Sequence, residues 1–127
     1  MSAKTLVEQF YSSDVANNET IVPDFFHKDC ELHWNSSSGF ALLRYDDIVS
    51  FFEGVRVSYN TMRFVHTHLL ENGENVTSRH HLYAQTIEQP NEEVLLAHFI
   101  AIWEVKDGKL YRCYELSQLA DEKTINS

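Results

Sequence analysis

The chain has 127 residues, of which 43% are hydrophobic and 23% are charged. This composition is typical of a folded globular protein and excludes a largely disordered chain, and the length suits a single domain, which we assign to residues 1–127. Ten Lys and Arg against nineteen Asp and Glu give a net charge of −9. Because no basic cluster offsets this charge, nucleic acids and anionic membranes are excluded as partners.

The N-terminal sequence indicates the compartment. It reads Met-Ser-Ala-Lys-Thr and lacks the apolar core of a signal peptide. We therefore expect a cytoplasmic protein, in which Cys30 and Cys113 are reduced thiols.

The first half of the chain is predicted to be mainly helical. Apolar side chains recur at helical spacing from residue 3 to about residue 17, around Pro23, and after Asp46, which suits the N-cap of a third helix. Between the second and third helices, residues 31–35 alternate like a short strand and residues 36–39 are expected to form a loop. The buried helical faces are expected to be Leu6, Val7, Phe10 and Tyr11, then Ile21, Val22, Phe25 and Phe26, then Ile48, Phe51, Phe52 and Val55.

The second half is predicted to consist of strands. Strand-like runs cover residues 62–70 and 76–87, and a hairpin covers residues 93–119, in which residues 94–103 are apolar at nearly every position. We predict an α+β fold, in which a four-stranded antiparallel meander wraps around the helices and leaves a pocket between them. The turns of this meander are expected at Asn72-Gly73, Gln89-Pro90-Asn91 and Asp107-Gly108.

The order of these elements and several motifs resembles the nuclear transport factor 2-like superfamily, in its SnoaL-like and ketosteroid isomerase-like branch. The motifs are LVEQFY at residues 6–11, FHKDCELHW at 26–34, DDIVSFF at 46–52 and KDGKL at 106–110. The resemblance covers almost the whole chain. It implies three N-terminal helices packed in the concave face of a curved, mainly antiparallel sheet (a cystatin-like cone), a deep apolar pocket and usually a homodimer through the outer sheet face. Members include isomerases, dehydratases, cyclases, hydrolases and binding modules, so one function does not follow.

The chemistry of ketosteroid isomerases does not transfer to this chain. Those enzymes use a tyrosine in the first helix and two aspartates in the sheet, and alignment on residues 26–29 places Phe10, Trp34 and Ala101 at these positions. Tyr11 is one residue from the first position, which on a helix is a rotation of roughly 100°. Since apolar groups replace all three functional groups, we exclude ketosteroid isomerisation by that mechanism.

Glu115 is the carboxylic acid that the resemblance places in the pocket. A three-residue turn at residues 106–108 would put it opposite Phe99 on the pocket face, whereas a two-residue turn would put it with Ile100 and Ile102 on the outer face. We expect the three-residue turn. Apolar neighbours such as Trp103 would then raise the pKa of Glu115 toward neutrality, as a general acid or base requires.

A purely structural role for Glu115, paired with Arg79 or with a histidine, is equally open at this stage. Strand histidines are the other ionisable candidates. By alternation His66 and His68 share one face, and one of His80 and His81 joins them. We take His66 and His80 as acid/base partners of Glu115, with exposed or hydrogen-bonded strand histidines as the alternative. No third ligand has the spacing of a metal site, so we expect neither a metal nor another cofactor.

Two classes of function remain. One is a small enzyme, such as an isomerase, dehydratase or cyclase, that transfers protons on an apolar metabolite; the other is a non-catalytic ligand-binding or dimerisation module. A homodimer is expected through the outer sheet face, where Val94, Leu96, Ile100 and Ile102 would otherwise be exposed. The expected ligand-binding residues are Phe10, Trp34, Phe52, Tyr59, Phe99, Ala101, Trp103 and Cys113.

Overall fold

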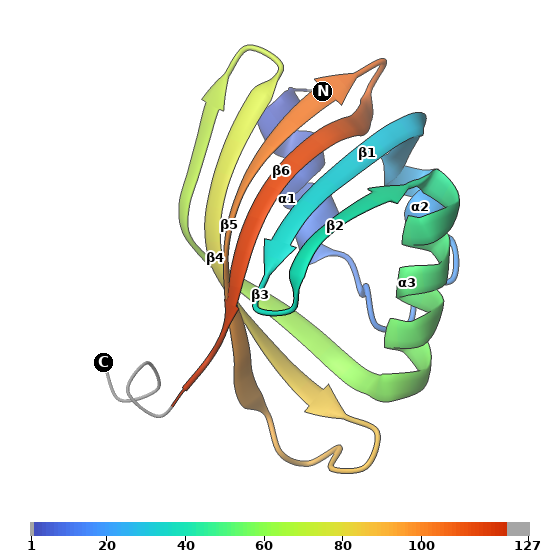
Figure 1. Cartoon of the computed structure of the whole chain (residues 1–127), viewed down its shortest axis with the longest axis vertical. Helices are drawn as coiled ribbons and strands as arrows, with labels where there is room; N and C mark the ends of the chain where they lie inside the picture. Colours follow the sequence, from blue (N-terminus) through green and yellow to red (C-terminus); the bar gives the residue numbers. More distant parts are fainter. Residues whose placement is uncertain (1, 122–127) are drawn as a thin grey trace.

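The computed structural model describes residues 2–121. It has an α+β fold, in which one curved six-stranded sheet surrounds α1 (Ala3–Ser12) (Figure 1). The prediction of an α+β fold with a curved, mainly antiparallel sheet is therefore confirmed. The remaining elements are α2 (Ile21–Phe25), β1 (Phe26–Ser36), β2 (Gly39–Arg44), α3 (Tyr45–Ser58), β3 (Tyr59–Asn72), β4 (Asn75–Thr86), β5 (Val94–Lys106) and β6 (Lys109–Leu119).

The four long strands β3 to β6 form the predicted antiparallel meander, and the strand order of the whole sheet is β2-β1-β6-β5-β4-β3. β1 pairs with β6 in parallel, while the other neighbouring strands are antiparallel. α3 contacts β1 and β2 at one end of the sheet and β3 at the other. The concave face therefore lies between the sheet and the helices.

α1 is shorter than predicted, because it ends at Ser12. Ser13 Oγ donates a hydrogen bond to the carbonyl oxygen of Phe10 at 2.6 Å. The backbone N–H groups of Asn17 and Asn18 then donate to the carbonyl oxygen of Asp14 at 3.1 and 2.8 Å, which closes a turn in place of a further helical turn. Short polar side chains of this kind compete with the helix for backbone hydrogen bonds.

The hairpin of β1 and β2 was not predicted from the sequence. Residues 36–39 were expected to form a loop, but Ser36 pairs with Gly39, and the chain returns along β1 as β2. The predicted N-cap of α3 was also wrong, since the helix begins directly after β2 at Tyr45. Asp47 closes this end, because its carboxylate accepts a hydrogen bond from the backbone N–H of Arg44 at 2.9 Å.

The turn between β5 and β6 has two residues, so the prediction of a three-residue turn was wrong. Lys106 pairs with Lys109, and Asp107 and Gly108 have φ values of 54° and 72°, which suit a two-residue hairpin turn of this twist. A β-bulge in β6 then shifts the register, and Glu115 pairs with Ala101 instead of Phe99 or Ile100. The bulge returns Glu115 to the concave face.

β-Bulges in β3 and β5 also place predicted residues on a different face of the sheet than expected. In β3, His66 pairs with His80 and His68 pairs with Arg79, so Thr67 is an extra residue. The prediction that His66 and His68 share a face was wrong, because the bulge turns His68 to the convex face.

The second bulge interrupts the outer apolar row that was predicted for β5. Tyr83 pairs with Leu95 and Leu82 pairs with Ala97, which leaves Leu96 unpaired in the ladder. Val94 pairs with Ala84, a buried concave-face residue. Only Ile100 and Ile102 of the predicted row therefore lie on the convex face.

The core is aromatic and centres on Phe10 of α1, whose side chain is 5% exposed. Its five ring neighbours have centroids 5.1–6.4 Å away, mostly in edge-to-face geometry, which is favourable for aromatic pairs. These neighbours are Tyr11, Phe25, Phe26, Phe52 and Trp103.

Candidate functional site

Two cavities adjoin on the concave side of the sheet. The inner one, which we call the chamber, has a volume of about 100 Å³. The outer one, which we call the vestibule, has a volume of about 570 Å³. The two cavities share part of their lining, because five side chains line both: Trp34, Phe51, Met62, Leu82 and Phe99.

The predicted site residues divide between these cavities and the core. Tyr59 lines the vestibule, Ala101 and Cys113 are buried without lining either cavity, and His66 lines a separate cavity of about 330 Å³ between α1 and β3. The structure thus brings Glu115 and His80 to one chamber and leaves His66 outside it. The predicted residues that line the chamber are Phe10, Trp34, Phe52, His80, Phe99, Trp103 and Glu115.

Glu115 is the carboxylic acid of the chamber. Its neighbours in the sheet are Ala101 on β5 and Trp34 on β1. Within residues 2–121 its side chain makes no hydrogen bond or ion pair, and burial raises its pKa to about 8. The alternative pairing with Arg79 is wrong, because Arg79 lies on the convex face and donates to Thr67 Oγ1 at 3.0 Å.

A connected set of polar side chains lies beside Glu115. Trp103 Nε1–H donates to the hydroxyl oxygen of Tyr11 at 2.9 Å. Ser78 Oγ lies 2.7 Å from His80 Nδ1, and the rings of Tyr11 and His80 are in contact at a centroid distance of 4.5 Å. These four residues come from α1, β4 and β5, so the helix and the sheet both fix the geometry of this set.

His80 is held as a neutral ring. Its plane stacks on Phe99 at a centroid distance of 5.2 Å and an interplanar angle of 7°. Desolvation and the neighbouring His66 and His81 lower its pKa to about 3. His80 is therefore uncharged at neutral pH and cannot act as a positively charged (imidazolium) acid.

Tyr11 and Ser78 are site residues that were not predicted from the sequence. Tyr11 was assigned to the buried stripe of α1 and then set aside as rotated away from the pocket, yet both Phe10 and Tyr11 line the chamber. Desolvation, with smaller contributions from Glu115 and Cys113, raises the pKa of Tyr11 well above its usual value. Ser78 shares a face with His80 by strand alternation, which was the available signal.

The vestibule is neutral and carries many hydroxyl groups. None of its lining residues in the described part of the chain is charged. One of its serines is fixed by the aromatic wall, since Trp34 Nε1–H donates to Ser117 Oγ at 2.8 Å. The serines that line it are Ser36, Ser37, Ser38, Ser50, Ser58 and Ser117.

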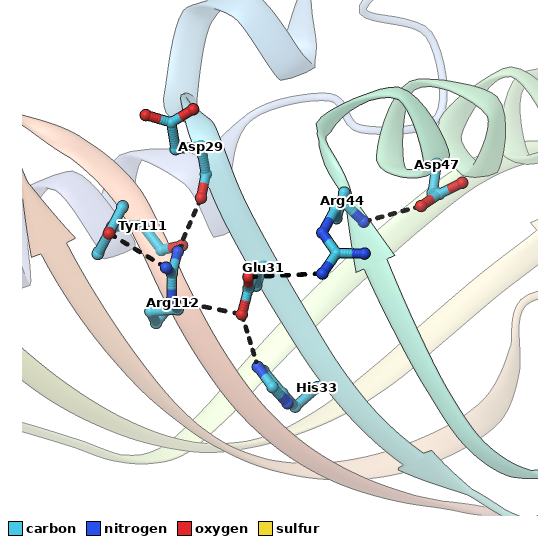
Figure 2. A network of polar contacts seen from close by, with 7 residues as sticks. All are labelled: Asp29, Glu31, His33, Arg44, Asp47, Tyr111 and Arg112. Carbon is cyan, nitrogen blue, oxygen red and sulfur yellow. Dashed lines mark hydrogen bonds and ion pairs between the residues drawn. The ribbon is translucent and has the colours of Figure 1, made fainter.

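A network of charged side chains lies around Glu31 on the convex face. Figure 2 shows Glu31 of β1 between Arg112, Arg44 and His33, with nitrogen–oxygen distances of 3.5, 3.9 and 3.2 Å. Arg112 also donates to the carbonyl oxygen of Asp29 at 2.7 Å. We call these residues the Glu31 network, and its polar groups satisfy one another outside the chamber.

An apolar patch lies on the convex face of β5 and β6. Ile100 pairs with Leu116, and Ile102 pairs with Tyr114, so the four side chains are side by side. They are between 43% and 59% exposed. We call this set the convex patch.

Metal-ligating residues are scattered in the described part of the chain. Among residues 2–121, no three or more His, Cys, Asp or Glu side chains are grouped to hold a metal ion. No helix within the same residues is both long enough and apolar enough to cross a membrane.

Comparison with known proteins establishes the family. The model of the SnoaL-like domain family matches residues 7–113, so the chain belongs to this family, within the nuclear transport factor 2-like superfamily. A search of curated protein sequences gave no significant match.

Solved structures show the same fold at low sequence identity. IdmH from Streptomyces antibioticus, a candidate polyketide cyclase, is 10% identical with a TM-score of 0.72, and the alignment covers 92% of each chain. An NTF2-like protein of unknown function from Burkholderia pseudomallei is 16% identical with a TM-score of 0.65, over 91% of this chain and 90% of that one. At these identities the similarity establishes the fold alone.

Proposed function

We propose that this protein is an enzyme that transfers a proton on a neutral, apolar, carbonyl-bearing metabolite, as an isomerase, dehydratase or cyclase does, with Glu115 as the acid and base. The observation that carries the proposal is the Glu115 carboxyl in the wall of the chamber, which has no partner within residues 2–121. This side chain is half-buried, and a ligand in the chamber can supply the interaction that the protein does not. Structurally similar proteins described as cyclases support the reaction class.

The protonation state of Glu115 suits this role. A carboxylic acid with a pKa of about 8 is about nine-tenths protonated at pH 7, and the remainder is a strong base in an apolar setting. The same residue therefore removes a proton from carbon as a carboxylate and returns it as a carboxylic acid. The neutral walls of the vestibule favour an uncharged ligand, and the negative net charge disfavours an anionic one.

One observation favours a binding function instead. Tyr11 is paired with Trp103, and Ser78 is paired with His80. Within residues 2–121, Glu115 therefore lacks the hydrogen-bonded partner that orients a typical catalytic acid or base. A binding module would use the same cavity without proton transfer.

The two functions are separated by hydrogen–deuterium exchange on a simple ketone. The probe is 2-acetylnaphthalene in deuterated buffer, and the loss of its methyl proton signal is followed by NMR. We expect Glu115→Gln to slow the protein-dependent exchange by about 10²–10⁴-fold, because a positioned acid or base contributes this much. The matched control is Glu31→Gln on the opposite sheet face, which should keep the wild-type rate. Tight binding without exchange would support the binding module.

We also propose a homodimer through the convex patch. Four adjoining side chains that are each more than two-fifths exposed, Ile100, Ile102, Tyr114 and Leu116, form an apolar surface of the kind that marks protein interfaces. The double variant Ile100→Lys with Ile102→Lys should be monomeric in size-exclusion chromatography with light scattering. A wild-type protein that is monomeric at tens of micromolar would overturn this proposal.

A further inference from the structure

We propose that His80 is a second catalytic residue of the chamber, which donates a hydrogen bond from Nε2–H to the carbonyl oxygen of the substrate as a neutral imidazole. This inference rests on the proposed proton transfer by Glu115 and gives it an electrophilic partner. It also restricts the substrate to compounds with a carbonyl group next to the carbon that loses its proton.

The contact with Ser78 suits the tautomer of His80 that the proposal requires. Ser78 Oγ lies 2.7 Å from His80 Nδ1, and a serine hydroxyl can donate to an unprotonated ring nitrogen. Tyr11, whose hydroxyl oxygen accepts from Trp103 Nε1–H at 2.9 Å, lies against the same ring at a centroid distance of 4.5 Å. Because a neutral imidazole has one N–H, the proton of His80 is then on Nε2.

Nε2 of His80 has no protein partner in the described part of the chain. Within residues 2–121 it makes no hydrogen bond, while Nδ1 of the same ring contacts Ser78. The ring itself lines the chamber and is fixed by stacking on Phe99 and by contact with Tyr11 at a centroid distance of 4.5 Å. A ring with an unpaired nitrogen thus lies in the wall of the chamber.

The sheet register sets the distance between His80 and Glu115. Glu115 pairs with Ala101, and His80 pairs with Phe99, two residues farther along β5. Two strand spacings across the sheet and two residues along it separate the Cα atoms by about 12 Å in a flat sheet, and the curvature shortens this distance. Ala101 presents only a methyl group between them, so a carbonyl group and its neighbouring carbon fit between the two side-chain ends.

The proposed step is the formation of an enolate followed by return of the proton to carbon. The carboxylate of Glu115 takes the proton from the carbon beside the carbonyl, the C–H electron pair forms the enolate double bond, and the carbonyl π electrons move onto oxygen. His80 Nε2–H stabilises the resulting oxyanion, and the carboxylic acid of Glu115 then returns the proton to carbon. The low pKa of His80, about 3, keeps the ring neutral throughout. Ser78, Tyr11 and Trp103 are positioning residues, since they act through His80.

The tautomer is tested without any substrate. Long-range proton–nitrogen NMR of uniformly ¹⁵N-labelled protein at pH 7 should show His80 with a protonated Nε2 and an unprotonated Nδ1. Ser78→Ala removes the donor to Nδ1 and should populate the other tautomer. A wild-type His80 with its proton on Nδ1, or with both nitrogens protonated, would overturn the inference.

The donor role is tested with carbonyl-labelled 2-acetylnaphthalene bound to the protein. Its C=O stretching frequency should be lower in the wild-type complex than in the complex with His80→Leu, and His80→Gln, which keeps an N–H donor, should restore part of the shift. His80→Leu should also slow methyl exchange by about 10²–10³-fold. An unchanged frequency in His80→Leu would contradict the donor role.

The same measurements distinguish the two proposals. Glu115→Gln should lose exchange and keep the lowered C=O frequency. If the wild type shows the lowered frequency without exchange, the hydrogen-bond donor stands and proton transfer by Glu115 fails. If exchange depends on Glu115 while His80→Leu changes neither rate nor frequency, the proposed function stands and the role of His80 fails.

Discussion

Glu31 and Glu115 lie on neighbouring strands of one sheet and face opposite sides of it. Glu31, on the convex face, is surrounded by Arg112, Arg44 and His33 (Figure 2). Glu115, on the concave face, has Trp34 and Ala101 as its sheet neighbours, and burial raises its pKa to about 8. The same side chain is therefore a structural group on one face and a reactive group on the other, because the environment sets its protonation.

The largest expected difference is in the stability lost when an aromatic side chain is removed from the concave face or from the convex face. Phe10→Ala removes the ring at the centre of the concave aromatic cluster and should lower the free energy of unfolding by about 3–5 kcal/mol. Phe40→Ala is the matched control, since this ring is 60% exposed, and it should change stability by less than about 0.5 kcal/mol. Urea unfolding of both variants measures the contrast. Equal effects would mean that the chamber wall is not the core of the fold.

The pH dependence of stability should also separate the two glutamates. The unfolded chain releases the proton of Glu115 near its ordinary pKa of 4.5, whereas the folded protein keeps it up to about pH 8. Between these values the folded state binds the extra proton, so the free energy of unfolding should fall by up to about 1.4 kcal/mol per pH unit as the pH rises. Below pH 4.5 both states are protonated and the contribution of Glu115 vanishes.

Glu115→Gln is the reference for this measurement, because the amide does not titrate while His80 and the other ionisable groups remain. The difference in unfolding free energy between wild type and Glu115→Gln should change across pH 5–8. Glu31→Gln should leave the wild-type slope in place. A difference that stays flat from pH 5 to 8 would show that Glu115 ionises normally.

A small effect is expected for the Glu31 network itself. Glu31→Gln keeps the shape of the side chain and removes its charge, while Arg112 retains its hydrogen bond to the carbonyl oxygen of Asp29. Because the partners are partly solvated, the loss should be about 0.5–1 kcal/mol and should shrink in high salt. Thermal unfolding at two ionic strengths measures it. A loss above about 3 kcal/mol would place Glu31 in the same class as a buried charge.

The meander and its turns were predictable from the sequence because they depend on local patterns. Asn72-Gly73 and Asp107-Gly108 are strong turn signals, and the apolar runs between them have the length of strands. β2 was missed because its six residues follow a serine-rich stretch and carry no distinct strand signal of their own. Its position depends on pairing with β1, which is a tertiary interaction.

Side-chain orientation was less predictable, because bulges move residues between faces. The bulge in β3 sends His68 to the convex face, and the bulge in β5 removes Leu96 from the outer row. Glu115 reached the expected face although the expected turn was wrong, since a two-residue turn and a bulge together give the same face as a three-residue turn. Tyr11 was misjudged because the chamber surrounds the end of α1 widely enough for two consecutive residues to line it.

The most direct test of the account is the titration of Glu115 itself. Carboxyl-selective ¹³C NMR of protein labelled at the glutamate side chains, with Glu115→Gln to assign the resonance, gives the pKa of this one group between pH 4 and pH 9. The account predicts a midpoint near 8, caused by desolvation in the chamber. A midpoint near the ordinary value of 4.5 would contradict it and would remove Glu115 as an acid and base at neutral pH.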